Sequence, residues 1–468
     1  MSVVILLADG VRPDTLQSAI ETGTVPALAR LRDEGSFHTI TTCFPSVTGP
    51  AYTPFLMGRF PGPVGLPGIR WFDRDRAACS FPDYTRSYVG VQVNRINTDL
   101  DRDAPTIFEL CERSLGSLTP VTRGLRKGNR LGRLTIKTAW RVARIHFAGN
   151  VAGWLDIDRD VADLVVDHIR RTQPDFTFAA MVGIDKTSHA FGQPSPLTEE
   201  SLKLVDATAA RIRADAERDG RWSSMHLWVT SDHGHSPVKT HEDLAGVVAS
   251  WGFRTVAHPW VFTVRPEVAV MVSGNAMAHL YVDVRGRKRT YWSDMPARER
   301  SLVECLLERP SVDLVILPHG DGATVRSRDR GDAEITTRGD RLSYYRRMGG
   351  DPLGVGQDVR DATADETYDL TINTDYPDSI LQLARLASSP RSGEILISAA
   401  RTWDFRSKHE PIPHVSAHGA LYREHMLVPF LSNRPVAGTP RRTTDIMPSA
   451  LVALGRPVPP GLDGQSFI

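Results

Sequence analysis

The sequence begins with a short apolar run that ends in a carboxylate, Val3-Val4-Ile5-Leu6-Leu7-Ala8-Asp9-Gly10. A β-branched run of this length, without alternating polar residues, is typical of a strand that is buried on both faces of a parallel sheet. Asp9 then follows directly on the carboxyl end of a central strand. Open α/β sheets bind their ligands at that edge, so we expect Asp9 to face a functional site.

Two later apolar runs end in the same way. Phe176–Val182 predicts a second strand that ends shortly before Asp185. Met225–Thr230 predicts a third strand, which ends just before Asp232 and His233. Because the carboxyl ends of parallel strands meet at one edge, these side chains are expected to share a rim. Helical stretches between the strands favour an α/β fold with a largely parallel central sheet flanked by helices.

The composition limits the class of protein. The 468 residues are 41% hydrophobic and 24% charged, with 56 Lys and Arg against 55 Asp and Glu. This is ordinary for a globular protein and excludes disorder as the main state. The formal net charge of +1 argues against a general nucleic-acid binder. The length fits one catalytic α/β domain over residues 1–468 that carries insertions, rather than three independent domains.

Two segments depart from the α/β pattern and are interpreted as insertions. Residues 320–371 are polar and rich in Arg, Asp and Gly, which predicts a smaller inserted subdomain or a surface excursion. Residues 113–155 contain nine Lys and Arg and no acidic residue, which predicts a basic helical insertion. Five of these side chains recur at the spacing of one helical stripe: Arg130, Arg133, Lys137, Arg141 and Arg144.

A basic amphipathic helix has three interpretations. It can lie on an anionic membrane surface, it can line the entrance for an anionic substrate, or it can be a solvated helix that packs against the sheet. We therefore expect a peripheral contact with anionic membranes through residues 113–155 as one alternative.

The cysteines and the start of the chain predict a subcellular location. Cys43, Cys79, Cys111 and Cys305 lie far apart and include no Cys-x-x-Cys pair, so they fit neither a disulfide framework nor a cysteine zinc site. The first residues show no basic region, cleavage site or membrane-length apolar stretch. These features predict a cytoplasmic protein, with the basic insertion as its candidate contact with a membrane surface.

The residues at the expected rim are of the types that bind metals. Mixed carboxylate and imidazole ligands suit zinc, manganese or iron, whereas magnesium and calcium prefer oxygen ligands. An Asp and a His four residues apart reach the same point on one helical turn. Six such residues are enough for two ions, and the set comprises Asp9, Asp185, His189, Asp232, His233 and His418.

A hydroxyl residue lies between these elements in Phe44-Pro45-Ser46-Val47-Thr48-Gly49-Pro50. Thr48 precedes an expected helix, with Pro50 in its first turn. A hydroxyl there would lie beside free backbone N–H groups that can hold an anion. The alternative is a simple helix N-cap, worth about 1 kcal/mol.

These motifs resemble the alkaline phosphatase superfamily, and most closely its nucleotide pyrophosphatase/phosphodiesterase branch. The family's Asp after the first strand, its Phe-Pro-Ser-x-Thr-x-Pro segment and its later Asp-x-x-x-His, Ser-Asp-His-Gly and His-Gly elements occur here in order. Gly58, Pro61 and Gly65 fall at the family's spacing from Thr48. The resemblance spans the chain, although residues 66–170 and 236–410 are loosely covered, and it implies an alkaline phosphatase-like fold.

The resemblance also implies an activity and roles for residues. It implies hydrolysis of phosphodiester or pyrophosphate bonds in a small anionic substrate through a phosphoryl-threonine intermediate on Thr48. The N–H of Gly49 would bind a phosphoryl oxygen. Both metal ions would be divalent, most often zinc in this family, with manganese or iron as alternatives. One ion would be held by Asp9, Thr48, Asp232 and His233, and the other by Asp185, His189 and His418.

Departures from the family pattern leave the substrate open. The branch has Asn three residues after the nucleophile, where this chain has Ala51, and a second Asn where this chain has Ile69 followed by Arg70. Arg70 could clamp phosphate oxygens, as suits a phosphomonoester or a phosphonate of the phosphonoacetate type, or it could be a solvated surface side chain. Tyr52 and Trp71 are candidates for stacking on a nucleoside, with core packing as the alternative.

Two competing interpretations fit the motifs less well. Cys43-Phe44-Pro45-Ser46 resembles the start of the sulfatase signature Cys-x-Pro-Ser-Arg, but Val47 replaces the required Arg and Cys43 lies five residues too early relative to Gly58. A non-catalytic metal-binding protein is the other alternative. It would be expected to lose some of the ligands or the nucleophile, and all of them are present here.

Overall fold

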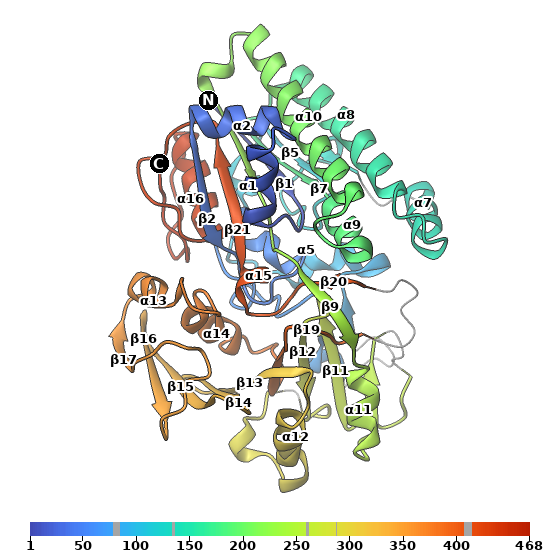
Figure 1. Ribbon diagram of the computed structural model, residues 1–468, viewed down its shortest axis with the longest axis vertical. Coiled ribbons are helices and arrows are strands. Elements are labelled where there is room, and N and C mark those ends of the chain that lie inside the picture. The colour runs from blue at the N-terminus through green and yellow to red at the C-terminus, as the bar shows by residue number, and fades with distance from the viewer. Residues whose placement is uncertain (78–84, 133–135, 259–261, 287, 407–413) are drawn as a thin grey trace.

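The computed structural model of the protein describes residues 1–77, 85–132, 136–258, 262–286, 288–406 and 414–468. Within these residues the chain forms two large sheets, one of seven strands and one of nine. In Figure 1 the seven-stranded sheet and its long helices occupy the upper half of the view, and the nine-stranded sheet lies below. The predicted α/β fold, with a largely parallel central sheet and an additional subdomain, is confirmed.

Strand β1 (Ser2–Ala8) lies in the middle of the central sheet, as its apolar run predicts. It pairs in parallel with β7 (Phe176–Met181) on one side and with β8 (Met225–Thr230) on the other. The three carboxyl ends therefore meet at one edge. The order is β2-β21-β8-β1-β7-β5-β6, with β21 antiparallel to its neighbours. The other members are β2 (Ser36–Thr41), β5 (Ser114–Ser117), β6 (Arg130–Leu131) and β21 (Leu427–Ser432).

Helices cover both faces of this sheet, which explains why β1 is apolar throughout. Leu6 and Ala8 face one core layer, and Ile5 and Leu7 face the other, because successive side chains of a strand point to opposite faces. The first layer is covered by α1 (Pro13–Glu21), α2 (Pro26–Glu34), α8 (Gly153–Thr172), α9 (Gly183–Phe191) and α10 (Pro196–Arg218). The second layer is covered by α3 (Thr53–Met57), α6 (Ile107–Leu110) and α16 (Ile446–Ala453).

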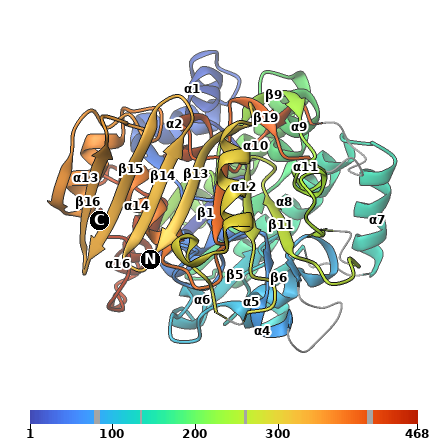
Figure 2. The ribbon, with the colours of Figure 1, turned by 90° about the horizontal axis from the view of Figure 1, so that it is seen from below.

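The nine-stranded sheet forms the additional subdomain, with the order β10-β11-β12-β18-β13-β14-β15-β16-β17. Figure 2 shows β13 to β16 side by side. The strands are β10 (Thr255–Ala257), β11 (Val268–Ser273), β12 (Met277–Tyr281), β13 (Val312–His319), β14 (Gly322–Ser327), β15 (Gly331–Arg338), β16 (Arg341–Arg347), β17 (Val359–Ala362) and β18 (Ile395–Ala399). Its helices are α11 (Leu244–Ser250), α12 (Ala297–Leu307), α13 (Ala364–Thr371) and α14 (Ser379–Ala387).

The polar segment 320–371 supplies β14 to β17 and α13 of this sheet. In β15 buried and more exposed residues alternate, because one face of the sheet packs on a core and the other is open. The polar composition that suggested a surface excursion therefore belongs to strands with one solvated face. These strands extend the sheet from β13, which pairs with β14 on one side and with β18 on the other.

Two small sheets complete the fold. In the first, β9 (Ser236–His241) lies between β19 (Thr402–Asp404) and β20 (Ser416–Ala417), which brings the residues after β8 next to the segment around His418. In the second, β3 (Arg70–Phe72) pairs with β4 (Thr85–Ser87). The remaining short helices are α4 (Arg74–Ala77), α5 (Ile96–Asp99) and α15 (Arg423–Met426).

The basic insertion differs from its prediction. Its helix, α7 (Ile136–Phe147), begins after Arg130, which lies in β6 and donates to the backbone oxygen of Leu125, so the predicted stripe is wrong at its start. Arg133 lies outside the described residues. Arg141 is exposed and pairs with Asp160 of α8. In Figure 2, α7 lies at the margin of the molecule, opposite β16.

Acidic residues elsewhere in the chain lie close to other basic residues of this segment. Arg113 pairs with Asp175, and Arg123 pairs with Glu109 at 3.1 Å. The stretch without acidic residues in the sequence is therefore partly neutralised in space. Among the described helices, none is both long enough and apolar enough to cross a membrane.

Candidate metal centre

The predicted rim residues converge where β1 and β8 end and where α9 follows β7. Asp9 follows β1, and Asp232 and His233 follow β8. Asp185 and His189 lie one turn apart on α9. The side chains of this set are buried, apart from His189 with 12% exposure, so the fold removes several carboxylates and imidazoles from water at one place.

The first candidate group is formed by Asp9, Asp232 and His233, whose ligand atoms lie within 4.8 Å of one another. The Nε2 atom of His233 is 3.4 Å from Oδ1 of Asp9 and 3.5 Å from Oδ2 of Asp232. Burial, and then the neighbouring carboxylate of Asp232, raise the pKa of Asp9 well above its ordinary value. Oδ2 of Asp232 is buried and has no hydrogen-bond partner among the described residues. A cation would satisfy both features.

The second candidate group surrounds Asp185. Its Oδ1 atom is 3.2 Å from Nε2 of His189 and 3.5 Å from Nε2 of His418. Although burial opposes its ionisation, Lys186 and His189 hold the pKa of Asp185 well below its usual range. Lys186 contacts the other oxygen of the carboxylate at 2.7 Å. Asp185, His233, His235 and His418 form a second set with ligand atoms within 4.8 Å of one another, so His233 belongs to both groups.

The imidazoles are oriented by backbone carbonyls. Nδ1 of His189 is 2.9 Å from the oxygen of Ser416, Nδ1 of His418 is 2.9 Å from that of Ser46, and Nδ1 of His233 is 3.1 Å from that of Gly234. A carbonyl oxygen only accepts, so each Nδ1 carries a proton, and in its neutral form each ring presents a bare Nε2 to the centre. This is how proteins orient histidines that bind metal ions. The donor set therefore fits two divalent ions.

Helix α9, which carries two of these residues, is held at its start by Asp158 of α8. The carboxylate of Asp158 accepts hydrogen bonds from the N–H groups of Val182 at 3.0 Å and Gly183 at 2.7 Å. Burial raises the pKa of Asp158 to about 7, against the opposing effect of these two hydrogen bonds. Asp158 thus positions the helix without reaching the metal groups itself.

Thr48 lies beside the first group. Its Oγ1 atom is 3.1 Å from Nε2 of His233 and 3.4 Å from Oδ1 of Asp9. The alternative role as an N-cap is wrong, because the 3₁₀ turn Pro50–Tyr52 begins after Gly49 and receives no side-chain cap. Gly49 has φ of +97°, which favours glycine, and no hydrogen bond of its N–H is found within the described chain.

The aromatic candidates for substrate stacking lie in the core. Tyr52 is fully buried and packs edge-on against Phe178 with ring centroids 5.2 Å apart. Trp71 is 1% exposed, donates its Nε1–H to the hydroxyl of Tyr88 at 2.9 Å and lies under the guanidinium group of Arg391. Neither ring is exposed for a nucleoside to stack on, so both stacking predictions are wrong and the packing alternative holds.

Arg70 lies at the start of β3, and its side chain is partly exposed. Its backbone oxygen is 3.5 Å from Oγ of Ser273, which ends β11 just before the turn where Asn275 bridges to His418. The segment of Arg70 is therefore near the second group through the β11–β12 turn. A contact of its guanidinium group with phosphate stays a prediction.

Two neighbouring histidines were not singled out from the sequence. His235 is fully buried, with Nε2 at 2.9 Å from Oδ1 of Asp185. The ring centroid of His414 is 4.4 Å from that of His189, and burial lowers the pKa of His414 to about 2. A signal for His235 exists, because it lies two residues after His233 and an extended chain returns to the same side at that spacing.

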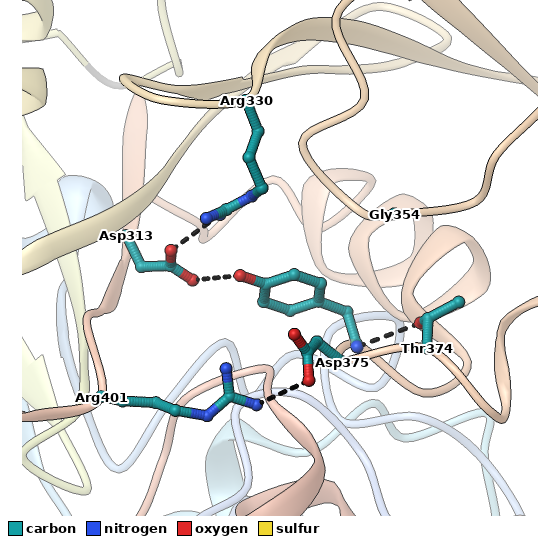
Figure 3. A pocket seen from close by; sticks show the side chains of 7 residues that line it. Asp313, Arg330, Gly354, Thr374, Asp375 and Arg401 are labelled. Atoms are coloured by element: carbon teal, nitrogen blue, oxygen red, sulfur yellow. Dashed lines mark hydrogen bonds and ion pairs between the residues drawn. The ribbon is translucent and has the colours of Figure 1, made fainter.

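A separate polar cavity of about 360 Å³ lies away from these groups and is shown in Figure 3. Arg330 and the hydroxyl of Tyr376 both bind Asp313, at 2.7 and 2.6 Å. Arg401 pairs with Asp375 at 3.1 Å. The lining charges are thus paired with one another, as in a structural junction between loops.

Comparisons with known proteins agree with this architecture. A family model described as type I phosphodiesterase/nucleotide pyrophosphatase matches residues 3–421. No curated protein sequence matches significantly.

Solved structures share the fold at low sequence identity. Phosphonoacetate hydrolase from Sinorhizobium meliloti 1021, in complex with phosphonoformate, aligns with a TM-score of 0.57 and 16% identity over 97% of this chain and 96% of that chain. Murine ectonucleotide pyrophosphatase/phosphodiesterase 5 aligns with a TM-score of 0.59 and 14% identity over 98% and 96% of the two chains. The human protein of that name aligns with a TM-score of 0.59 and 14% identity over 99% and 97%.

Proposed function

The chain belongs to the type I phosphodiesterase/nucleotide pyrophosphatase family of hydrolases, and we propose that it cleaves phosphodiester or pyrophosphate bonds with Thr48 as the nucleophile. The observation that carries this proposal is the position of the Thr48 hydroxyl, 3.1 Å from His233 and 3.4 Å from Asp9. A nucleophile needs an activating group within hydrogen-bond reach, and here both neighbours belong to a candidate metal group.

Two divalent ions would complete the site. Zinc is the proposed metal, with manganese or iron as alternatives, because the ligands mix carboxylate and imidazole. When bound, two such ions polarise the phosphoryl group and lower the pKa of a hydroxyl beside them. We assign Asp9, Thr48, Asp232 and His233 to one ion, and Asp185, His189 and His418 to the other.

The residues of the chain then have defined tasks. Oγ1 of Thr48 forms a bond to phosphorus while the bond from phosphorus to the leaving oxygen breaks, which gives a phosphoryl-threonine. Water then cleaves the bond between phosphorus and Oγ1 and restores the hydroxyl. Asp9 and His233 lie beside the hydroxyl of Thr48 and, as ligands, would hold the ion that lowers its pKa. The free N–H of Gly49 is proposed to donate to a phosphoryl oxygen.

The family and the ligands of its relatives support a proposed substrate class. An inactive threonine-to-alanine variant of the murine protein was solved in complex with AMP, and the Sinorhizobium enzyme in complexes with phosphonoformate and phosphonoacetate. A small nucleotide-like phosphodiester or pyrophosphate is the proposed substrate. A phosphomonoester or phosphonate is the second candidate, which Arg70 favours as a side chain able to clamp a more highly charged phosphoryl group.

Turnover of two chromogenic substrates separates these candidates. The zinc-loaded protein is expected to cleave bis-p-nitrophenyl phosphate faster than p-nitrophenyl phosphate. The reverse preference would move the assignment to monoesters. Absence of turnover on either substrate and on phosphonoacetate, with two ions bound per chain, would favour a non-catalytic metal-binding protein.

The cytoplasmic location and the contact of residues 113–155 with anionic membranes stay predictions. In α7, Trp140 is exposed and is an apolar side chain that such a surface could take up. Sedimentation with anionic liposomes at low salt tests the contact, and a protein that stays in the supernatant would contradict it.

A further inference from the structure

We propose that His235 is a fourth protein ligand of the ion held by Asp185, His189 and His418. The proposal rests on the two-ion function above and adds a residue to one of its sites. Three imidazole nitrogens meet one carboxylate oxygen in this group. Nε2 of His235, His189 and His418 lie 2.9, 3.2 and 3.5 Å from the same Oδ1 atom of Asp185.

The hydrogen bonds of His235 leave its Nε2 atom bare. Its Nδ1 atom is 3.1 Å from Oγ of Ser416, and the hydroxyl of Ser416 donates to the backbone oxygen of Ser236 at 3.0 Å. The hydroxyl has only one proton, so it accepts from Nδ1–H of His235.

His235 therefore has the same tautomer as His189 and His418. Three nitrogen lone pairs and an ionised carboxylate face one another in a buried space, with no proton between them. Lys186 pairs with the other carboxylate oxygen, Oδ2, at 2.7 Å and not with Oδ1. The arrangement around Oδ1 is costly in an apolar environment unless a cation lies among the four atoms. A cation bound there would have one carboxylate and three imidazoles around it.

A histidine close by shows the contrasting case. His425 is also fully buried, but Nδ1 accepts from the N–H of Ala420 at 3.0 Å and Nε2 lies 2.8 Å from Oγ of Ser236. Both nitrogens of His425 are thus satisfied by neutral protein groups. Burial alone does not leave an imidazole nitrogen bare in this part of the chain, and His425 is a matched control.

A fourth protein ligand changes the character of the second site. Closed structural zinc sites have four protein ligands, whereas catalytic sites have three and keep one position open. The ion at Asp185 is then expected to be held more tightly than the ion at Thr48. A substrate oxygen could reach it only as a fifth ligand.

The test measures metal affinity rather than activity. The metal-stripped full chain is titrated with Zn²⁺ against a chromophoric chelator. Wild-type protein is expected to bind two ions with distinct affinities. His235→Ala is expected to lower the Zn²⁺ affinity of the tighter site by more than about 100-fold. His425→Gln is expected to leave that affinity unchanged. An unchanged affinity of the tighter site in His235→Ala would overturn the proposal.

His235→Gln separates a ligand from a positioning residue, because its amide N–H could still donate to Asp185. Recovery of wild-type affinity to within about 10-fold would overturn the ligand assignment. X-ray absorption of wild-type protein with one equivalent of Zn²⁺ needs no variant. Three imidazoles on zinc support the proposal, and two overturn it. If wild-type protein binds only one ion, the two-ion function proposed above is contradicted. The number of imidazoles on that one zinc ion still tests the assignment of His235.

Discussion

Two buried clusters of charge in this protein are satisfied in different ways. Near the start of α14, Asp378 and Arg442 are 1% and 3% exposed and form two hydrogen bonds of 2.8 and 2.9 Å. Gln382 donates to the same carboxylate at 2.8 Å. Although burial opposes its charge, Asp378 raises the pKa of Arg442.

The metal centre has the opposite character. Its carboxylates lie beside one another and beside imidazoles whose bare nitrogens cannot donate, and Oδ2 of Asp232 has no partner among the described residues. The Asp378–Arg442 cluster is complete within the protein, whereas the metal centre is complete only with cations from outside. Buried charge that the chain leaves unsatisfied therefore indicates function, and buried charge that it satisfies indicates structure.

The largest expected effect is a loss of function without a loss of stability. Thr48→Ala should lower turnover of the preferred substrate by at least about 10³-fold, since the reaction loses its nucleophile. The unfolding midpoint of the metal-stripped protein should stay the same, because Thr48 caps no helix. Steady-state kinetics and urea unfolding measure the two quantities. Thr48→Ser retains a hydroxyl and should keep part of the activity; an active alanine variant would remove the nucleophile assignment.

A loss of stability is expected instead at the Asp378–Arg442 cluster. Asp378→Asn removes the buried charge partner of Arg442 and leaves only the exposed Asp365 at 3.1 Å, so it should lower the free energy of unfolding by about 3–5 kcal/mol. Urea unfolding of the metal-stripped protein measures the loss. Asp369→Asn is the control, because Asp369 pairs with Arg441 at an exposed position and should cost about 1 kcal/mol or less. Equal losses in the two variants would break the comparison.

Removing a charge from the metal centre should stabilise the metal-stripped protein. Burial is the main cause that raises the pKa of Asp232, and Asp185 raises it further, so the carboxylate opposes folding when no metal is bound. Asp232→Asn should raise the unfolding free energy of the metal-stripped protein by about 0.5–2 kcal/mol. It should also reduce the stabilisation by Zn²⁺. Lower stability of the stripped variant would show that the protein already satisfies this group.

A further expected effect, at Asp158, depends on pH. The pKa of Asp158, about 7, is above the ordinary Asp value, so its contribution to stability is complete in acid and is lost as pH rises towards 7. Asp158→Asn mimics the protonated acid and does not titrate. Between pH 4 and pH 7, the free energy of unfolding of the variant should therefore rise relative to that of wild type by about 1–3 kcal/mol. Urea unfolding of the metal-stripped proteins measures this difference. A constant difference across that range would contradict the raised pKa.

The rim could be predicted because it follows from local patterns and one topological rule. Apolar runs predicted β1, β7 and β8, and the carboxyl ends of parallel strands meet, which brings Asp9 near Asp232. The spacing of Asp185 and His189 needed only one helical turn. Their roles as ligands stay proposals.

Other features depend on partners that are distant in sequence. Tyr52 and Trp71 follow the nucleophile, but their burial is decided by strands far along the chain, such as β7 and its Phe178. Residues 113–155 contain no acidic residue, but Arg113 pairs with Asp175 and Arg141 with Asp160 in the folded chain. The polar strands of 320–371 join a sheet through β13 and β18, whose pairing no local pattern reveals.

The central place of β1 has a consequence for synthesis of the chain. This strand is made long before its two neighbours in the sheet, β7 and β8. The apolar segment must therefore wait unpaired until β7 has been made, a period in which exposed strands invite aggregation. His418 is made long after β8, so a nascent chain gains its second metal group only well after the three central strands. Metal uptake by the second group would accordingly report that synthesis has passed His418.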